Sequence, residues 1–303
     1  MTIPSPSVAV IVNPATHGNV QRVLEILQAE APHGTRLEVF MTEHAGHASE
    51  LATSQAAWAD VLVAVGGDGT VGEVAGVARV TNKVLGIIPG GSTNIIAREL
   101  GIPTNVQQAV RLMFHSQGRI SLDAGICGDR TFLHMAGMGI DSLLFELADA
   151  NLKRKVGWMA YLPAAMKALT RPMATYTIRT AERDMVNVKS PLVLIANGRS
   201  IIAPQFRLDS RIRFDDGKLD VAVVTATRPD EIARVLARLA TRQLFDSPLV
   251  EWFTTTEITV EADPPMAVQL DGDVALHTPI SISIAPGAVT IIVPESQTRL
   301  PSF

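Results

Sequence analysis

The sequence predicts an N-terminal α/β domain with a parallel sheet, followed by a C-terminal domain of antiparallel β structure. In the first 122 residues, short apolar runs alternate with segments whose apolar residues recur at helical spacing. This pattern is typical of a parallel sheet covered by helices on both faces. Later in the chain, runs rich in Val, Ile and Thr are separated by turn residues, which favours antiparallel strands. We therefore place the domains at residues 1–122 and 123–303, and allow the last residues to return to the first domain.

The first domain is predicted to be Rossmann-like, with strands and helices in alternation. Its strands are predicted at Val8–Asn13, Arg36–Met41, Val61–Val65 and Leu85–Ile88. Its helices are predicted at Val20–Ala31, Ala45–Ala57, Val71–Ala78 and Ile95–Leu100.

The second domain is predicted to be β-sandwich-like. Its strands are predicted at Thr175–Thr180, Leu192–Ala196, Leu219–Val224, Glu257–Glu261, Pro279–Ile284 and Val289–Val293. Two helical stretches are predicted to interrupt them, at Ser142–Thr170 and Pro229–Thr241.

Composition excludes several classes of protein. Hydrophobic residues make up 47% of the 303 residues, which is enough for packed cores and argues against disorder. The single Cys127 excludes an internal disulfide framework and a zinc site built from cysteines. A net charge of −4 argues against a globally basic nucleic-acid binder, and we expect no nucleic-acid partner. Without a signal peptide or an apolar run of about 20 residues, the sequence predicts a cytoplasmic protein.

Two glycine-rich turns follow predicted strands and precede predicted helices. The first contains Gly66, Gly67, Asp68, Gly69 and Thr70, and the second runs from Pro89 to Asn94. A third turn begins at Asn13 and Pro14 after the first strand. Parallel strands place such turns on one edge of the sheet, where glycines and helix N-termini bind phosphate. These turns predict a nucleotide-phosphate site, although ordinary tight strand-to-helix connections would also use glycine.

Two common nucleotide-binding motifs do not account for these turns. Gly67–Gly72 fits G-x-G-x-x-G, but no carboxylate lies between Glu73 and Glu99, where a dinucleotide fold needs a ribose contact. The G-K-[ST] of a Walker P-loop is also absent. A dehydrogenase and a P-loop nucleotidase are therefore disfavoured.

Charge and histidine spacing suggest two weaker features. Residues 150–220 carry 13 Lys and Arg against 6 Asp and Glu, which fits either an anionic partner or solvated faces. His44 and His47 lie three residues apart near a helix start. For this pair we favour surface positions over a metal site.

These motifs together resemble the diacylglycerol kinase catalytic-domain family, which includes bacterial soluble lipid kinases and sphingosine kinases. The resemblance spans nearly the whole chain. It rests on Asn13-Pro14, Gly66-Gly67-Asp68-Gly69-Thr70 with Glu73, Pro89–Asn94, Gly137–Asp141, Asn197-Gly198, Asp216–Asp220 and Asp271-Gly272-Asp273. The same GGDGT turn also occurs in NAD kinases.

The resemblance implies a diacylglycerol kinase- and NAD kinase-like fold with ATP in a cleft between the domains. It implies that Asp68 acts near the phosphates through Mg²⁺, and that Asp271, supported by Asp273, is the general base toward a lipid hydroxyl. It also implies that Asp216, and less securely Asp215, hold a structural Mg²⁺. The nucleotide contacts it implies are Asn13, Thr42, Gly66, Gly67, Gly69, Thr70, Glu73, Gly91, Ser92, Thr93 and Asn94.

The same acids have a simpler interpretation. Asp-Gly is a strong hairpin-turn signal, so Asp271-Gly272 and Asp216-Gly217 also predict turns.

The resemblance implies an ATP- and Mg²⁺-dependent lipid kinase that phosphorylates a hydroxyl of diacylglycerol or a related lipid alcohol. We expect its lipid substrate at a membrane surface, with the protein peripheral at the inner face, and leave a homodimer open. One alternative is an NAD kinase-like enzyme, against which the absence of any Asn-Glu dipeptide counts. The other is a weakly catalytic nucleotide- or lipid-binding regulator. It is suggested by Asn19 and Ile95, which stand where relatives have a basic residue and an aspartate.

Overall fold

The computed structural model describes residues 6–16, 20–140, 173–201, 203–209, 211–241 and 243–298. The helical stretch predicted at 142–170 lies outside these residues, as do His17, Asn19 and Asp141. The chain forms two compact units, one of residues 1–122 and 287–303, the other of residues 123–286. No helix within the described ranges is long and apolar enough to cross a membrane.

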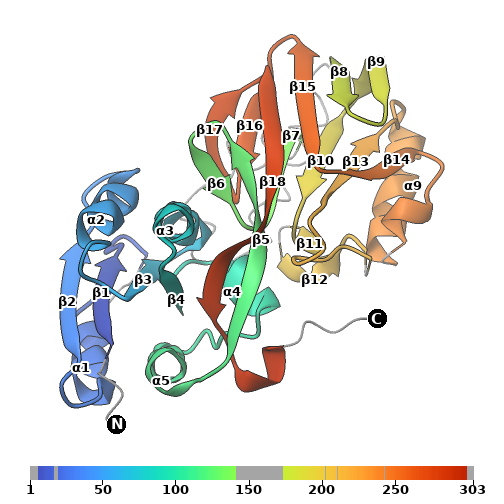
Figure 1. The fold of residues 1–303 in the computed structure, drawn as a ribbon. Coiled ribbons are helices and arrows are strands. Elements are labelled where there is room, and N and C mark those ends of the chain that lie inside the picture. The colour runs from blue at the N-terminus through green and yellow to red at the C-terminus, as the bar shows by residue number, and fades with distance from the viewer. Residues whose placement is uncertain are drawn as a thin grey trace. The chain divides into compact units, whose positions relative to one another are not determined.

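The first unit contains a parallel sheet with helices on both faces (Figure 1). Its strands are β1 (Ser7–Val12), β2 (Arg36–Met41), β3 (Val61–Gly66) and β4 (Val84–Pro89). Its helices are α1 (Val20–Glu30), α2 (His47–Gln55), α3 (Asp68–Thr81), α4 (Ile95–Glu99) and α5 (Val106–His115). The strand order is β2-β1-β3-β4, and the end of β18 (Ile280–Ile292) pairs with β4 in parallel.

Alternation along the strands explains why both faces of this sheet are covered. Alternate residues of β1 and β3, such as Val10 and Val63, pack with α1 and α5 in one hydrophobic cluster. The intervening residues, such as Ile11 and Leu62, are also buried, and they point to the opposite face, where α2 contacts β1 and α3 contacts β3. The near-continuous apolar runs in the sequence reflect this two-sided burial.

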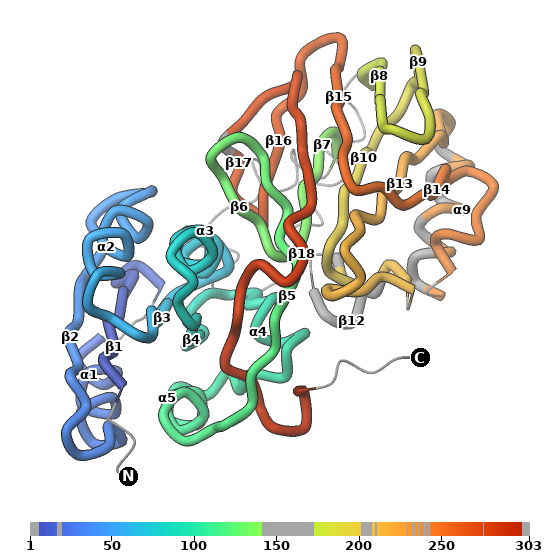
Figure 2. Tube along the Cα trace, viewed as in Figure 1, coloured from blue at the N-terminus to red at the C-terminus, as the bar shows by residue number. Residues whose placement is uncertain are grey.

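The second unit contains two antiparallel sheets that share one core. One has the order β14 (Val250–Thr255), β13 (Leu219–Val224), β10 (Leu192–Ala196), β7 (Met135–Gly139), β16 (Ala267–Leu270) and β17 (Asp273–His277). The other joins the start of β18 to β15 (Glu257–Asp263), β8 (Ala174–Thr180) and β9 (Asp184–Ser190) (Figure 2). Met138 and Val221 of the first sheet pack in one cluster with Tyr176 and Val260 of the second. This is the face-to-face packing of a β-sandwich.

Further strands and helices of the second unit have the following bounds. The strands are β6 (Arg130–Phe132), β11 (Ser200–Ile201) and β12 (Ala203–Arg207). The helix α9 (Pro229–Ala240) precedes the 3₁₀ turn η2 (Leu244–Asp246). The 3₁₀ turn η3 (Glu295–Gln297) follows β18 in the first unit.

The predicted fold class is confirmed, with local differences. The strands predicted at 279–284 and 289–293 are one strand, β18, which continues through Pro286 and Gly287 from the second unit into the first. β5 (Arg119–Cys127) crosses the same boundary. The stretch Gly137–Gly139, which resembles a family turn, lies inside β7. Helix α3 begins at Asp68 rather than Val71, so part of the glycine-rich turn is already helical.

Candidate functional site

The turns after β1, β3 and β4 lie at one edge of the parallel sheet. Val12 pairs with Val65, and Gly66 pairs with Pro89, so the three strands end level with one another. The backbone N–H of Asn13 donates to the carbonyl of Val65 (2.9 Å) and that of Gly90 to the carbonyl of Gly66 (2.7 Å). The structure thus brings together three turns that the sequence separates by more than twenty residues each.

Asn13 joins the first turn to the glycine-rich turn after β3. Its side-chain Nδ2 donates to Oγ1 of Thr70 (3.3 Å), while its Oδ1 accepts from the N–H of Ala15 (3.0 Å). Thr70 is buried and fills the space above Gly66, where an added Cβ would lie 2.6 Å from Oγ1 of Thr70. Both predicted nucleotide residues therefore shape the turns directly.

Gly67 and Gly91 bring two of the turns into backbone contact. A Cβ built on Gly91 would lie 2.7 Å from the Cα of Gly67, and one on Gly67 would lie 3.4 Å from the Cα of Gly91. A side chain at Gly91 would push the turns apart, whereas a Cβ on Gly69 would meet nothing within 4 Å. The surface at Gly69 is open for a bulky ligand to approach the backbone.

Asp68 occupies the first turn of α3 and links it to α4. Its Oδ1 accepts from the N–H of Ile96 (3.1 Å), one of the N–H groups that a helix start leaves without a helical partner. The N-terminal ends of α3 and α4 therefore meet at this carboxylate. Such ends carry partial positive charge, which suits phosphate oxygens as well as Asp68.

Asn94 closes the second glycine-rich turn on itself. Its Oδ1 accepts from the N–H of Gly91 (2.8 Å), and its Nδ2 donates to the carbonyl of Gly91 (2.6 Å). Its φ of 48° lies in the left-handed region, which asparagine tolerates better than most residues. Ser92 is exposed and Thr93 half-buried in the same turn.

Two predicted nucleotide residues lie beside these turns rather than in them. Thr42 is buried at the end of β2 and donates its N–H to the carbonyl of Val12 (2.9 Å). The carboxylate of Glu73 accepts from the N–H groups of Gly46 (3.1 Å) and Ser49 (3.3 Å), at the start of α2. Glu73 therefore caps α2, and a nucleotide contact by its carboxylate would compete with those bonds.

Asp271 and Gly272 form the two-residue turn of the β16–β17 hairpin. Leu270 pairs with Asp273 across the turn, and both central residues have positive φ, 49° and 89°. Positive φ at both positions defines a type I′ turn, for which Asp-Gly is a preferred pair. The hairpin interpretation of this motif is therefore confirmed.

The carboxylate of Asp271 is buried and bound by three backbone N–H groups. Oδ2 accepts from Leu133 (2.8 Å), and Oδ1 accepts from His134 (2.8 Å) and Met135 (3.0 Å). Burial raises the pKa of Asp271, while His134 and the three N–H donors act against that rise. The contacts give Asp271 a structural role, because three of the about four acceptor sites of its carboxylate hold the backbone of residues 133–135.

Asp273, two residues later, has a different environment. Its side chain is 47% exposed, and its Oδ2 accepts from Nη2 of Arg130 (2.6 Å). An exposed carboxylate held by one arginine can reach a ligand from solvent. The two acids of the Asp-Gly-Asp motif thus differ in what they can do chemically.

The predicted metal residues Asp215 and Asp216 also differ in their contacts and environments. Both oxygens of Asp215 accept from the guanidinium of Arg213 (2.9 and 3.2 Å), which leaves Asp215 poorly placed as a metal ligand. Burial and the nearby charge of Asp123 raise the pKa of Asp216. A cation bound by both carboxylates would offset their negative charges, so Asp216 and Asp123 fit Mg²⁺ better than Asp215 does.

Three further residues of this site carried no assigned role in the sequence analysis. Asn197 donates from Nδ2 to the carbonyls of Leu133 (2.7 Å) and Asp123 (2.9 Å). Asp123 accepts the N–H of Gly217 (2.6 Å), and Arg130 binds Asp273. The Asn-Gly pair at 197–198, directly after an apolar strand, was the available signal for Asn197. Nothing in the local sequence points to the other two.

Two family models together cover most of the chain. The diacylglycerol kinase catalytic domain matches residues 7–124, and the YegS C-terminal NAD kinase beta sandwich-like domain matches residues 135–293. With its parallel sheet, glycine-rich edge and antiparallel second unit, the chain belongs to the diacylglycerol kinase catalytic-domain family of lipid kinase-like phosphotransferases.

Individual relatives agree with this assignment. A protein of Chromohalobacter salexigens named "Probable lipid kinase YegS-like" is 30% identical, over 88% of this chain and 87% of the relative. One of the same name from Pseudomonas aeruginosa is 29% identical over 92% of each chain. In fold, the chain is similar to a Bacillus anthracis diacylglycerol kinase structure (TM-score 0.72, 22% identity, 97% and 99% covered). It is also similar to an Archaeoglobus fulgidus NAD kinase in complex with ATP (TM-score 0.52, 14% identity, 96% of each covered).

Proposed function

We propose that the protein is an ATP- and Mg²⁺-dependent lipid kinase that phosphorylates a hydroxyl of diacylglycerol or a related lipid alcohol. Family membership supports the kinase class, and the names of its relatives support a lipid acceptor. The observation that carries the proposal is the contact of Gly67 with Gly91 at the sheet edge. It leaves bare backbone beside two helix N-termini, the arrangement that binds phosphate.

ATP is proposed to place its phosphates over the glycine-rich turns. Gly69 offers open space there, and Asn13 and Thr70 fix the turn from below. Asp68 is proposed to act through Mg²⁺, which when bound neutralises phosphate charge and orients the γ-phosphate. Asp68 suits this because its carboxylate lies at the same edge, held by the N–H of Ile96.

For the general base, the contacts favour Asp273 over Asp271. A base must be able to accept the proton of the lipid hydroxyl, and a carboxylate whose oxygens already bind three N–H groups is badly suited to that. Asp273 is exposed, and within the described part of the chain its carboxylate is held by Arg130. We therefore propose Asp273 as the base, with Asp271 as the residue that builds its turn.

The lipid is proposed to be met at a membrane surface. The basic character of residues 150–220 supports this, because anionic headgroups attract such segments.

A structural Mg²⁺ is proposed at Asp216 with Asp123. It would link the loop before β13 to β5.

The function is tested by transfer of labelled γ-phosphate from Mg·ATP to a panel of acceptors. The panel contains diacylglycerol, monoacylglycerol, sphingosine, ceramide and phosphatidylglycerol in mixed micelles, and NAD in buffer. Labelled lipid would support the proposal and name the substrate. Labelled NAD instead would move the assignment to the soluble-substrate kinases.

Two matched variants accompany the panel. Asp68→Asn keeps an oxygen for the N–H of Ile96 but removes the charge, and we expect it to lose transfer while staying folded. Asp230→Asn removes another acid from the first turn of a helix, α9, and we expect it to keep transfer. Equal activity of both variants would contradict the role of Asp68.

A further inference from the structure

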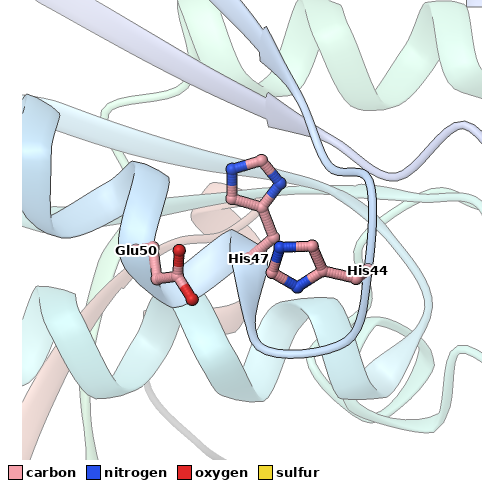
Figure 3. A group of neighbouring side chains, drawn as sticks. All are labelled: His44, His47 and Glu50. Atoms are coloured by element: carbon pink, nitrogen blue, oxygen red, sulfur yellow. The ribbon is translucent and has the colours of Figure 1, made fainter.

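Three side chains of types that can bind a metal ion meet at the start of α2. His44, His47 and Glu50 each offer a ligand atom, and these atoms all lie within 4.8 Å of one another (Figure 3). Among the described residues, this is the group in which three histidine, cysteine or acidic side chains converge so closely. Sequence spacing alone favoured surface positions for the two histidines. The structure adds the acid and the convergence.

The backbone that carries these side chains is held in place. His47 and Glu50 lie three residues apart on α2 and therefore share a face of the helix. His44 precedes them in a loop whose end, Gly46, donates its N–H to Glu73 of α3 (3.1 Å). The same carboxylate accepts from the N–H of Ser49 (3.3 Å). The backbone that carries the three side chains is therefore held by hydrogen bonds to Glu73.

His44 is oriented as a metal ligand needs to be. Its Nδ1 lies 3.0 Å from the carbonyl oxygen of Ala45. A carbonyl can only accept, so Nδ1 carries the hydrogen and Nε2 keeps its lone pair for a metal. A backbone carbonyl on the second ring nitrogen is the usual support for a metal-bound histidine.

His47 must exchange one contact to bind. Its Nδ1 accepts from the N–H of Glu43 (3.0 Å), and its ring stacks on that of His44, with centroids 4.6 Å apart and planes 10° apart. Ring nitrogens bind metals in the plane of the ring, so one ring must turn out of the stack. The released N–H of Glu43 is at an exposed residue, where water can replace the lost bond.

We propose that His44, His47 and Glu50 form a binding site for a divalent transition-metal ion, with Zn²⁺ as the expected ion and water completing its coordination. Two imidazoles and a carboxylate suit Zn²⁺, whereas Mg²⁺ prefers oxygen ligands and keeps its waters. The ion would fasten the loop that follows Thr42 to the first turn of α2. The proposal does not depend on the kinase assignment, since it concerns binding of the metal alone.

The test measures Zn²⁺ binding to the full chain without a histidine tag, after treatment with a chelator. Competition with a chromophoric zinc indicator gives stoichiometry and affinity. We expect one Zn²⁺ per chain at this site, undisturbed by a large excess of Mg²⁺. His44→Ala and Glu50→Gln should each weaken binding by at least about tenfold, since even second-sphere changes cost 10–100-fold.

His115→Ala is the matched control. His115 is also exposed and lies near a carboxylate, with its Nε2 3.8 Å from Glu30, but no third histidine, cysteine or acid of the described ranges joins this pair. Zinc affinity should be unchanged in this variant.

Thermal unfolding of each metal-free variant shows whether it is folded. Co²⁺ substitution gives an independent readout, a visible absorption band that His44→Ala should abolish. The proposal is overturned if the wild type takes up no zinc, if His44→Ala and Glu50→Gln bind it as the wild type does, or if His115→Ala loses as much affinity as they do.

Discussion

Asn197 and Asp271 hold the same three-residue segment of backbone, residues 133–135, from two sides. The carboxylate of Asp271 accepts all three of its N–H groups, and the N–H of Asp271 donates to the carbonyl of Met135 (2.9 Å). Nδ2 of Asn197 binds the carbonyl of Leu133 (2.7 Å), and its backbone N–H binds that of His134 (2.8 Å). Every backbone polar group of the segment is therefore satisfied, although its residues are buried.

Replacement of Asp271 by asparagine should destabilise the second unit. An amide offers one acceptor oxygen in place of two, and its NH₂ would face a buried N–H. We expect a loss of about 1–3 kcal/mol, or about 2–4 °C in Tm for each kcal/mol. Calorimetry would measure it, with Asp129→Asn, an exposed acid in the β5–β6 turn, as the control. An unchanged Tm in Asp271→Asn would show that the three N–H bonds contribute little.

Asn197→Asp should destabilise more than Asn197→Ala. The alanine variant leaves two buried carbonyls without a donor, but the aspartate variant turns acceptor oxygens toward them. The alanine change should cost about 1–3 kcal/mol. Urea unfolding at pH 8 would rank the two variants, and Asn187→Asp, at an exposed position, should have little effect. The reverse order would contradict donation by Asn197.

Two glycines of the proposed nucleotide site should respond differently to replacement by alanine. Gly91→Ala should disrupt the first unit, because its Cβ would lie 2.7 Å from the Cα of Gly67. Gly69→Ala should leave stability unchanged or raised, since the space is open and alanine favours the helix. It should nevertheless weaken ATP binding, measured by nucleotide titration, if phosphates approach this backbone. Wild-type affinity in Gly69→Ala would place the phosphates elsewhere.

Asp220 should make stability depend on pH. Burial, followed by the charge of Asp216, raises the pKa of Asp220 to about 7. The unfolded chain releases this proton near pH 4, so between about pH 4 and 7 the folded state binds more protons. The free energy of unfolding therefore falls as the pH rises through this range, by at most about 4 kcal/mol. The full loss is reached above pH 7.

Asp220→Asn isolates this effect. Asparagine keeps an oxygen for Nε1 of Trp252, which donates to Oδ1 of Asp220 (3.2 Å), and it never ionises. The Tm of the variant minus the Tm of the wild type should be larger at pH 8 than at pH 5. A Tm difference that is the same at both pH values would contradict the raised pKa.

Features set by local sequence could be predicted, and contacts between distant segments could not. β1 and β3 were predictable because burial on both faces makes their sequences continuously apolar. The Asp271-Gly272 turn was predictable from its residue types. β18 was split in two because Pro286 and Gly287 usually end a strand, whereas here the two halves have different partners, β15 and β4.

The different environments of Asp271 and Asp273 could not be predicted from the residues around them in the sequence. The first depends on N–H groups of residues 133–135, and the second on Arg130, all far away in the chain. The resemblance alone implied that Asp271 is the base and that Asp273 supports it. The folded structure distinguishes them, because it buries the carboxylate of Asp271 and leaves that of Asp273 exposed.

We propose that this chain transfers the γ-phosphate of Mg·ATP to a lipid hydroxyl with Asp273 as the base. The most direct test is single-turnover transfer to the preferred lipid by the wild type, Asp273→Asn and Asp271→Asn, each scaled to its folded fraction. We expect Asp273→Asn to fold and bind ATP as the wild type does and to lose at least about 100-fold in the transfer rate. We expect Asp271→Asn to lose mainly stability. Wild-type transfer by folded Asp273→Asn, or no lipid product from the wild type, would contradict the proposal.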